Sequence, residues 1–445
     1  MKEKNTVGAA CLKSFFDDGT FVELGAYISR PGTEDRVEGV ICGYGSVCGR
    51  LVFAFAQDGS LMKGAMDGPH AQKILRTYEK ALSVGAPIVG FFDCAGAVVL
   101  EGAAALAGYG ALLRTAARAS GRIPQIAVIN GVCAGTMAAV AALFDATVMV
   151  KDAGRLYVSS PTQAGEAVGT AETVFEQGNA ALLAEDGAAA SAAVRTLLSY
   201  LPDRAGQGIP SRATADDPNR AMVSEDSDSA LKTMQVAVDA GSFVELYGGY
   251  GQAVSAGLAS MGGICSVVIA MEGELDAASV NKMRRVTAMA DRLGLPVVTF
   301  VNSTGVKSDA EAETEIAGAL SELASVQVKA TTPRVTALVG DAVGAGFIFG
   351  GSRALGADLV LALPDAQVAA LNAHSAVAFL WNDRITPDCT REMLEREWCE
   401  TVATPEKAAA VGEVDDIVAP AELRARLIAA LFMLADKGTA PLEVL

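Results

Sequence analysis

The sequence predicts an α/β fold of two tandem domains related by internal duplication, and two observations favour it. Strand-like apolar runs alternate with helical stretches, a pattern typical of crossover connections in α/β proteins. Three segments of the first half also return in the second half in the same order: Phe21–Leu24 as Phe243–Leu246, Ala86–Asp93 as Leu295–Asn302, and Pro124–Gly131 as Pro333–Gly340. A chain of 445 residues is long enough for two domains that each bury a core.

The first half begins with short strands punctuated by glycine and continues with helices and strands in alternation. Glycine and polar residues bound each apolar run, which is the usual signal for the end of a strand. The predicted elements are strands Gly39–Cys48 and Arg50–Gln57, a helix over about Pro69–Val84, strand Pro87–Phe92, an alanine-rich helix ending near Ser120, strand Ile126–Ile129, and a helix after Gly135.

The second half repeats this order, and a linker separates the halves. Leu201–Ala230 is rich in Pro, Asp, Ser and Gly and has no apolar period, which predicts a surface linker. We therefore predict domains over residues 1–205 and 234–445, joined by a linker over 206–233. Helical spacing over Glu406–Lys437 predicts a closing helical segment that packs on the second domain. The other predicted elements are strands Ser266–Met271, Val297–Val301, Val335–Val339 and Leu359–Leu363, with helices near Asp276–Leu293 and after Gly344.

Charge and cysteine usage argue against several classes of protein. The net charge of -17, without clustered Lys and Arg, argues against a nucleic-acid surface. The eight cysteines form no C-x-x-C pair and have no histidine nearby in sequence, so we expect no metal site. No segment with a basic start and an apolar run leads the chain, so we expect free thiols in a cytoplasmic protein.

One uncharged stretch, Ile123–Phe144, is long enough to cross a bilayer. It contains Pro124, Gln125 and the pair Asn130 and Gly131, at places where a strand would end and a turn begin. The stretch therefore predicts a buried strand, a turn and a buried helix rather than a transmembrane helix.

Four stretches resemble the carboxyltransferase subunits of biotin-dependent acyl-CoA carboxylases and decarboxylases. They are Gly85–Gly90 leading to Asp93–Ala97, Ser120–Ile126 leading to Gly131–Gly135, Leu355–Gln367, and Gly412–Pro420. The resemblance covers nearly the whole chain and implies two tandem crotonase-like domains of the ClpP/crotonase superfamily. The first domain would serve the acyl-CoA side and the second the biotin side. The resemblance also implies a homo-oligomer that pairs one subunit's first domain with another subunit's second.

The reaction implied by the resemblance moves a carboxyl group between carboxybiotin and a short-chain acyl-CoA of acetyl, propionyl or methylmalonyl type. Released CO2 leaves a biotin anion that takes the α proton of the ester, and the enolate then attacks CO2. The implied cofactor is biotin on a separate carrier protein, with acyl-CoA as substrate. Implied partners are a biotin carboxyl carrier protein and biotin carboxylase or membrane decarboxylase subunits. Run backwards, the same site would decarboxylate an acyl-CoA, as in sodium-pumping decarboxylases.

The expected catalytic groups are backbone amides, because both the thioester oxygen and the ureido oxygen gain negative charge during the reaction. By the resemblance, Gly135 and Thr136 form one oxyanion hole and Ala345 and Gly346 the other. Small residues leave the backbone nitrogen accessible, but Thr136 is β-branched where the family tends to have glycine. The residues expected to line the two substrate sites are Ala95, Gly96, Ala134, Gly305 and Gly344.

Departures from the family pattern leave a second interpretation open. Cys94–Val98 lacks the arginine that the family often has there, and Asn302–Val306 replaces a Pro-Gly-Phe-x-x-Gly turn. Pro161–Ala190 is short and contains no histidine. These losses are also compatible with a catalytically impaired subunit that organises a biotin-dependent complex.

A third interpretation comes from a different class, the NAD(P)-dependent Rossmann dehydrogenases. Gly344-x-Gly346-x-x-x-Gly350 resembles a dinucleotide fingerprint, and Asp365 stands about where an acid could bind the ribose. The first copy, from Gly131 to Met137, lacks the G-x-G spacing. This favours the oxyanion role that both copies could share.

Matched polar and thiol residues near these turns are predicted to be structural. Asp93 and Asn302 end matching strands and are expected to cap the turns that follow. Cys94 and Cys133 are expected to be buried small apolar residues, because no activating base or cation is predicted beside them.

The remaining polar residues are also interpreted as structural. Lys282, Arg284 and Arg285 are predicted to form a solvated helix face, which is also a candidate for binding an acidic partner surface. His374 follows the predicted strand Ala366–Leu371, where the family tends to have a glutamate and where it could lie near biotin, and a structural role is the preferred interpretation. Neither His70 nor His374 has an evident Ser or Cys partner, and there is no G-x-S-x-G elbow.

Overall fold

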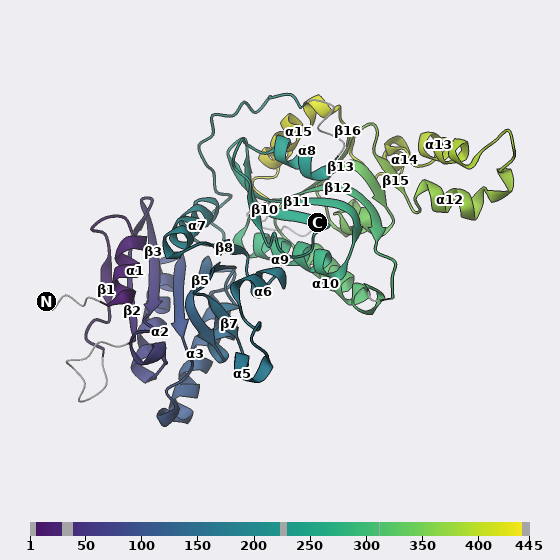
Figure 1. Cartoon of the computed structure of the whole chain (residues 1–445). Helices are drawn as coiled ribbons and strands as arrows, with labels where there is room; N and C mark the ends of the chain where they lie inside the picture. The colour runs from purple at the N-terminus through teal and green to yellow at the C-terminus, as the bar shows by residue number, and fades with distance from the viewer. Residues whose placement is uncertain (1–5, 29–38, 223–228, 311, 438–445) are drawn as a thin grey trace. The chain divides into compact units, whose positions relative to one another are not determined.

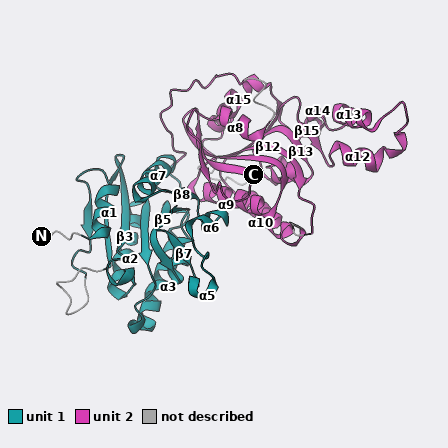
Figure 2. Ribbon diagram, in the orientation of Figure 1, with its two compact units in different colours: residues 1–207 teal, residues 208–445 magenta. Residues whose placement is uncertain are grey.

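The computed structural model describes residues 6–28, 39–222, 229–310 and 312–437. They form two compact units, residues 1–207 and 208–445 (Figure 1, Figure 2). Each unit is built around one eight-stranded sheet with helices packed against it.

The first unit's sheet has the order β1-β2-β3-β4-β5-β6-β8, with β7 beside β5. β1, β2 and β3 are antiparallel neighbours, and all other pairs are parallel. The parallel strands put their carboxyl ends at one edge, where ligands bind in open α/β sheets. The strands are β1 Val22–Leu24, β2 Val40–Val47, β3 Arg50–Gln57, β4 Ile88–Cys94, β5 Gln125–Ala134, β6 Ala146–Val150, β7 Arg155–Tyr157 and β8 Leu182–Ala184.

Helices cover both faces of this sheet. Val40 and Cys42 of β2 belong to the core shared with α2 and α3, whereas Ile41 lies against Gly8 of α1. Because successive strand residues point to opposite faces, α1 packs on the face opposite α2 and α3. The helices are α1 Val7–Phe15, α2 Gly68–Val84, α3 Ala103–Ala119, α4 Thr136–Ala141, α5 Pro161–Ala164, α6 Ala171–Glu176 and α7 Gly187–Tyr200, with short 3-10 turns η1 Met62–Gly64 and η2 Val99–Glu101.

The second unit repeats this sheet strand for strand, which confirms the predicted duplication. Its order is β9-β10-β11-β12-β13-β14-β16, with β15 beside β13. The strands are β9 Val244–Leu246, β10 Val254–Met261, β11 Ile264–Leu275, β12 Val297–Val306, β13 Arg334–Val343, β14 Leu359–Ala362, β15 Gln367–Ala369 and β16 Asp416–Ile417. α8 and α15 share a core with its central strands.

The second unit's helices follow the same order until β15. Between β15 and β16 the chain makes a longer excursion than the first unit does between β7 and β8, and this excursion contains α12, α13 and α14. Trp381 and Trp398 pack edge to face there, with ring centroids 5.3 Å apart. The helices are α8 Ala230–Ala237, α9 Ala277–Leu293, α10 Ile316–Lys329, α11 Ala345–Phe349, α12 Ala373–Leu380, α13 Arg391–Thr401, α14 Pro405–Ala410 and α15 Pro420–Met433, with 3-10 turns η4 Ala312–Thr314, η5 Arg353–Leu355 and η6 Asn382–Arg384.

Two predicted segments differ from the structure. The closing segment Glu406–Lys437 is not one helical stretch, because the short strand β16 separates α14 from α15. Part of the predicted linker pairs with the second unit's sheet: Arg212 donates its amide to Gly263 O and Pro210 O accepts from Cys265 N. Residues 223–228 of that linker lie outside the described residues, and α8 begins inside its predicted end.

The uncharged stretch Ile123–Phe144 forms a strand, a turn and a helix, as predicted. β5 pairs with β4 and β6 on either side, and α4 follows it directly. Among the described residues, no helix has the length and apolar character needed to span a bilayer.

Candidate functional site

In the first unit, two neighbouring parallel strands end side by side and each runs into a glycine turn. Cys94 of β4 pairs with Cys133 of β5, and the next glycines are Gly96 (φ 130°) and Gly135 (φ 64°). We call residues 95–97 and 134–137 the first turn pair. Because the strands are in register, the two turns lie next to each other.

The second unit has the same arrangement. Ser303 of β12 pairs with Ala342 of β13, and the next glycines are Gly305 (φ 120°) and Gly344 (φ 52°). We call residues 304–306 and 343–346 the second turn pair. The close match of backbone angles indicates that the duplication preserved the turns as well as the strands.

A carboxylate ties the ends of the first unit's strands together. Asp93 Oδ1 accepts from Val132 N and Oδ2 accepts from Gly59 N, both at 3.1 Å. Burial raises the pKa of Asp93, and the two amide hydrogen bonds only partly oppose this. A Cβ on Gly131 would lie 2.3 Å from the Asp93 carboxyl group, so glycine is required there. Asp93 therefore bonds the neighbouring strand, and the prediction that it caps its own turn is wrong.

An amide takes this place in the second unit. Asn302 Oδ1 accepts from Asp341 N at 2.9 Å, and its Nδ2 donates to Glu272 Oε2 at 3.0 Å. Gly340 is the counterpart of Gly131, because a Cβ there would lie 2.3 Å from Asn302 Oδ1. The Asn302 amide group can donate to Glu272, whereas an ionised carboxylate in its place would have no hydrogen to donate.

The structure corrects the predicted role of Gly135. Its N–H donates to Tyr157 O of β7 at 2.9 Å, and the equivalent Gly344 N–H donates to Ala369 O of β15 at 2.9 Å. The prediction that the Gly135 amide faces a ligand is therefore wrong. Glycine is needed for the backbone angles (φ 64°, ψ -134°), since a Cβ there would meet nothing within 4 Å.

The free amides come one residue later. Thr136 and Ala345 are the first residues of α4 and α11, and in the described part of the chain neither amide donates a hydrogen bond, nor does the Gly346 amide. A Cβ on Gly346 would lie 2.7 Å from Ser303, so its small size serves packing. Thr136 and Ala345 are thus the equivalent positions of the two copies.

The residues predicted to line the sites do lie in the two turn pairs, but some of their amides are engaged. Ala95 N donates to Lys63 O at 3.0 Å, and Ala134 lies inside the pairing of β5 with β7. A Cβ on Gly96 would meet nothing within 4 Å, whereas Gly305 N donates weakly to Ser303 Oγ at 3.4 Å. Of this set, Gly96 leaves the most room beside a free amide.

Buried side chains lie at the ends of the strands that lead into the turns. Cys94 and Cys133 are fully buried, which confirms the structural prediction, and burial raises the pKa of both thiols. Cys94 Sγ lies 3.7 Å from Tyr109 Oη. In the second unit Ser303 replaces Cys94 and donates to Gly273 O at 2.7 Å. A thiol held protonated by burial is a poor nucleophile.

Charged groups of both signs lie beside each turn pair, since Asp93 precedes the first and Lys307, which pairs with Asp309, follows the second. Next to the first turn pair stands Lys63, an exposed lysine in η1 whose carbonyl bonds Ala95. Next to the second stand Glu272, which bonds Asn302, and Asp341, whose pKa is raised by burial. Lys63 is not among the residues predicted from the sequence, because a single lysine before a glycine carries no distinctive signal.

The predicted solvated face of α9 is only partly correct. Lys282 is 1% exposed, so its assignment to that face is wrong; its Nζ lies 3.9 Å from Glu245 Oε1, and burial lowers its pKa. The equivalent Lys73 of α2 is also buried and donates to Val40 O at 2.7 Å. A long methylene stem lets each ammonium reach the sheet.

The other predicted surface residues are near the protein surface and paired. Arg284 pairs with Glu322 at 3.2 Å, and the Arg285 guanidinium lies 5.8 Å from the Tyr250 ring centroid. His374 is exposed on α12, and its Nδ1 lies 2.8 Å from Glu395 Oε1.

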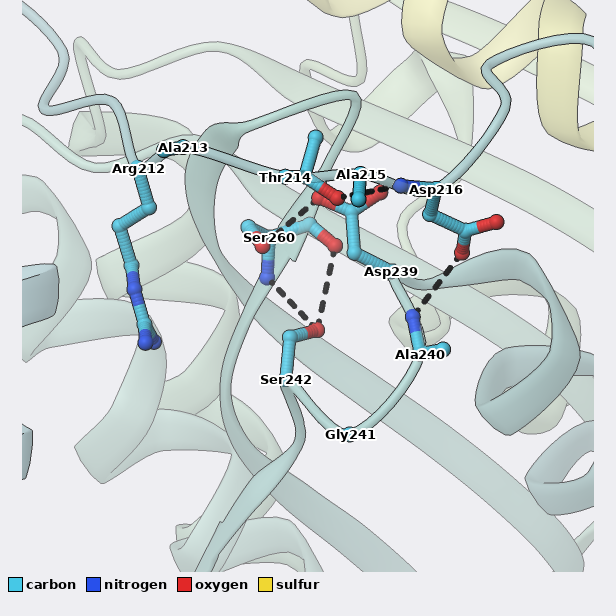
Figure 3. A pocket seen from close by; sticks show the side chains of 10 residues that line it. All are labelled: Arg212, Ala213, Thr214, Ala215, Asp216, Asp239, Ala240, Gly241, Ser242 and Ser260. Atoms are coloured by element: carbon cyan, nitrogen blue, oxygen red, sulfur yellow. Dashed lines mark hydrogen bonds between the residues drawn. The ribbon is translucent and has the colours of Figure 1, made fainter.

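A pocket of about 410 Å³ lies within the second unit, where the former linker passes the start of β9 (Figure 3). Its acidic groups are already paired: Asp239 accepts from Arg424 at 2.7 Å, and Asp216 accepts from Arg220 at 2.9 Å. It includes no residue of the second turn pair. It is lined by Arg212, Ala213, Thr214, Ala215, Asp216, Asp239, Ala240, Gly241, Ser242 and Ser260.

Comparison with protein families gives a match along almost the whole chain. The model of the carboxyl transferase domain matches residues 5–442. The chain is 32% identical to the carboxyltransferase subunit of propionyl-CoA carboxylase from Haloferax mediterranei, over 95% of this chain and 89% of that protein. It is also 32% identical to methylmalonyl-CoA decarboxylase subunit alpha from Veillonella parvula, over 96% of this chain and 89% of that protein.

A solved structure shares the fold. Transcarboxylase 12S, described as a hexamer with methylmalonyl-coenzyme A and methylmalonic acid bound, superimposes with a TM-score of 0.89 at 28% identity. The match covers 98% of this chain and 91% of the transcarboxylase chain.

Proposed function

The chain belongs to the carboxyl transferase family, and on that premise we propose that its first unit holds an acyl-CoA ester and its second unit holds biotin. The observation that carries the proposal is the pair of equivalent free amides, Thr136 N–H in one unit and Ala345 N–H in the other. Each stands at the carboxyl end of a central strand, beside a glycine whose own amide is tied back to the sheet.

The chemistry explains why two such amides are needed. Removing the α proton of a thioester moves negative charge onto its carbonyl oxygen, and a fixed donor aimed at that oxygen stabilises the charge. Thr136 N–H, with the open turn at Gly96 beside it, suits this oxygen. Carboxybiotin, when bound, supplies the carboxyl group and the base. Ala345 N–H is the donor suited to the ureido oxygen in the second unit.

Local charge supports this assignment of reactants. An acyl-CoA carries several anionic phosphate oxygens, whereas the ureido ring of biotin is uncharged. The second turn pair has Glu272 bonded to Asn302 and Asp341 on the adjacent strand. Carboxylates at this position disfavour a polyanionic ligand by like-charge repulsion. The first turn pair also has a carboxylate beside it, Asp93, but both of its oxygens accept from amides and the exposed Lys63 lies there as well, so the first unit is the better place for the CoA ester.

The relatives' names support a short acyl group and a multi-subunit setting. The matched proteins are named for propionyl-CoA and methylmalonyl-CoA, so we propose a short-chain acyl-CoA as substrate, with biotin presented on a separate carrier protein. A homo-oligomer agrees with the hexamer described for transcarboxylase 12S. Carboxylation and decarboxylation use the same groups in opposite order, so one site serves both directions.

Neither competing interpretation is favoured. The family match extends through Gly344–Gly350, so the dinucleotide interpretation of that motif loses its support. The turns that depart from the family pattern, Cys94–Val98 and Asn302–Val306, lie on the strands next to Thr136 and Ala345, whose own amides form no hydrogen bond in the described part of the chain. We therefore infer an active transferase rather than an impaired scaffold.

The proposal is tested by carboxyl transfer with the purified chain. Methylmalonyl-CoA and free biotin are the probes, and labelled carboxyl groups are followed from one to the other, alongside acetyl-CoA and propionyl-CoA in the reverse direction from carboxybiotin. We expect transfer that requires both reactants and saturates with the CoA ester. Failure of every ester to exchange label with biotin, by a folded and assembled protein, would contradict the proposal. Binding of NADH in a fluorescence titration would favour the dehydrogenase interpretation instead.

A further inference from the structure

An unusual backbone turn lies directly beside the first turn pair. Met62, Lys63 and Gly64 have φ of 51°, 54° and 64°, so three successive residues adopt the left-handed conformation. L residues rarely adopt it, and two non-glycine residues in succession are rarer still. Strained backbone of this kind persists where surrounding structure enforces it, and it concentrates at ligand sites.

Contacts with the end of β4 hold this turn in place. A Cβ on Gly64 would lie 1.8 Å from Asp93 O, so the backbone there is pressed against the strand. Lys63 O accepts from Ala95 N at 3.0 Å, and Gly64 N donates to Leu61 O at 2.9 Å. The backbone of Lys63 is therefore fixed next to the first turn pair.

The side chain of Lys63 is available to a ligand. It is exposed, and within the described part of the chain its ammonium forms no ion pair. The carboxylates near Lys63 accept hydrogen bonds from other groups. Asp58 accepts from Gly8 N and Ser60 N, Asp67 accepts from His70 N, and Asp93, which is close in space, accepts from two amides. In a chain with a net charge of -17, a fixed unpaired cation beside the site is a local exception.

The lysine described beside the second turn pair, Lys307, differs from Lys63 because it pairs with Asp309 at 2.8 Å. The second unit's connection between β11 and α9 is shorter than the first unit's connection between β3 and α2, and the end of β11 carries Glu272 and Glu274. Glycine would fit the left-handed position without strain, so a lysine there indicates a use for the ammonium. We propose that Lys63 binds an anionic oxygen group of the CoA ester, an inference that rests on the proposed function.

Two parts of such an ester carry anionic oxygens: the phosphates of coenzyme A and the free carboxylate of a carboxylated acyl group. Both are recognised by the same ammonium chemistry. Propionyl-CoA has only the phosphates, whereas methylmalonyl-CoA has both, so comparing these two esters separates the sources.

The test is calorimetric binding of both esters to the assembled wild-type protein and to three variants. Lys63→Gln removes the charge, Lys63→Arg keeps it, and Lys80→Gln removes the charge of an exposed lysine at the far end of α2 as a matched control. We expect Lys63→Gln to weaken binding about two- to fivefold, as for a solvent-accessible ion pair, with the loss shrinking at high salt. Lys63→Arg and Lys80→Gln should bind like the wild type.

The pattern of losses identifies the group bound. A loss for methylmalonyl-CoA alone supports the carboxylate, and an equal loss for both esters supports the phosphates. Equal affinities for Lys63→Gln and Lys80→Gln with both esters would overturn the proposal while leaving the proposed function intact. A wild-type protein that binds neither ester would overturn both.

A fourth variant separates binding from structure. Lys63→Gly relieves the left-handed strain, so we expect its midpoint of thermal unfolding to rise by about 2 to 4 °C, while its affinity for the ester falls as in Lys63→Gln. A variant that gains stability without losing affinity would show that Lys63 has no part in binding.

Discussion

Each unit has an aspartate just before its first strand, Asp17 before β1 and Asp239 before β9. Each aspartate accepts from the same kinds of group, but the two lie in different surroundings. In the first unit, Asp17 accepts from Ser46 Oγ at 2.7 Å, from the amides of Cys48 and Gly49, and from Arg195 at 2.7 Å. Arg195 and Asp17 remain about one third exposed, at 32% and 28% of their side-chain surface.

In the second unit, Asp239 accepts from Ser260 Oγ at 2.8 Å, from the amides of Gly262 and Gly263 at 2.9 Å, and from Arg424 at 2.7 Å. Here the arginine side chain is fully buried and the aspartate is 3% exposed. Burial by itself would raise the pKa of Asp239, but the hydrogen bonds from Arg424, Gly263 and Ser260 outweigh it and hold the pKa below its ordinary value.

The two clusters show that duplication preserved the contacts while the surroundings changed their energetic weight. The segment that was predicted to be a linker (206–233) covers the Asp239–Arg424 pair, because its Asp216 and Arg220 lie beside these two residues. An ion pair that stays in water contributes little, whereas breaking one inside the protein leaves a buried charge. The same reasoning applies to the two turn pairs, which share a backbone and differ in nearby charge.

The largest expected difference is between Arg424→Ala and Arg195→Ala. Removing Arg424 leaves the buried Asp239 unpaired, so we expect the second unit to lose about 3–5 kcal/mol of unfolding free energy. Removing Arg195 should cost the first unit about 1 kcal/mol or less. Hydrogen exchange measured by mass spectrometry reports each unit separately. Similar losses in the two units would mean that burial does not set the weight of this contact.

A smaller difference is expected at the ends of the central strands. Asn302→Asp removes the donor to Glu272 and places two carboxylates together, so we expect a loss of about 2 kcal/mol at pH 7. The loss should diminish in acid, where one of the two carboxylates becomes protonated. Asp93→Asn is the matched change in the first unit. An asparagine has one side-chain oxygen, so it can accept from only one of the two amides, Val132 N and Gly59 N, that Asp93 binds. Urea unfolding followed by the fluorescence of Trp381 and Trp398, both in the second unit, measures the first variant. An unchanged urea midpoint would contradict the expected repulsion.

The turn glycines should respond alike. Gly135→Ala and Gly344→Ala each force an L residue into positive φ, which costs about 1–2 kcal/mol. Gly344→Ala should cost slightly more, because its Cβ would lie 3.3 Å from Ala370 O, whereas the Gly135 Cβ meets open space. Thermal unfolding of the two variants measures this. A much larger loss for Gly135→Ala would show that the two turns are not equivalent.

The smallest effect concerns acid stability. Hydrogen bonds from Ser46 and Arg195 lower the folded-state pKa of Asp17, so its contribution is present above the ordinary aspartate pKa of about 4 and is lost as pH falls below it. The stability gap between the wild type and Asp17→Asn should therefore be widest at neutral pH and narrow below pH about 4. Thermal unfolding across this pH range tests the sign, and a gap that widens in acid would reverse it.

Much of the framework was predictable because it depends on local patterns. Repeated segments fixed the equivalence of β4 with β12 and of β5 with β13, and Asp67 and Asp276 cap α2 and α9 at the predicted helix starts. The number of residues between Asp93 and Asn302 is the same as between Gly135 and Gly344. The same spacing pairs Thr136 with Ala345, so their equivalence could have been predicted from the sequence.

The rest depended on contacts between distant segments. The Gly135 amide donates to Tyr157 O of β7, a strand that was not among the predicted elements, and Lys282 is buried because its stem reaches towards Glu245. The left-handed turn at Lys63 is imposed by Asp93 and Ala95 rather than by its own sequence. Tertiary contacts of this kind leave no periodic signal in a single sequence.

The central claim is that one free amide in each unit stabilises one of two negative oxygens. Thr136→Pro and Ala345→Pro remove those N–H groups at first helical positions, where proline is well tolerated. Their controls, Thr136→Ala and Ala345→Gly, keep the amides. In carboxyl transfer from methylmalonyl-CoA to biotin, each folded proline variant should be about 100- to 1,000-fold slower than its control. Proline variants that transfer carboxyl groups as fast as their controls would contradict the account.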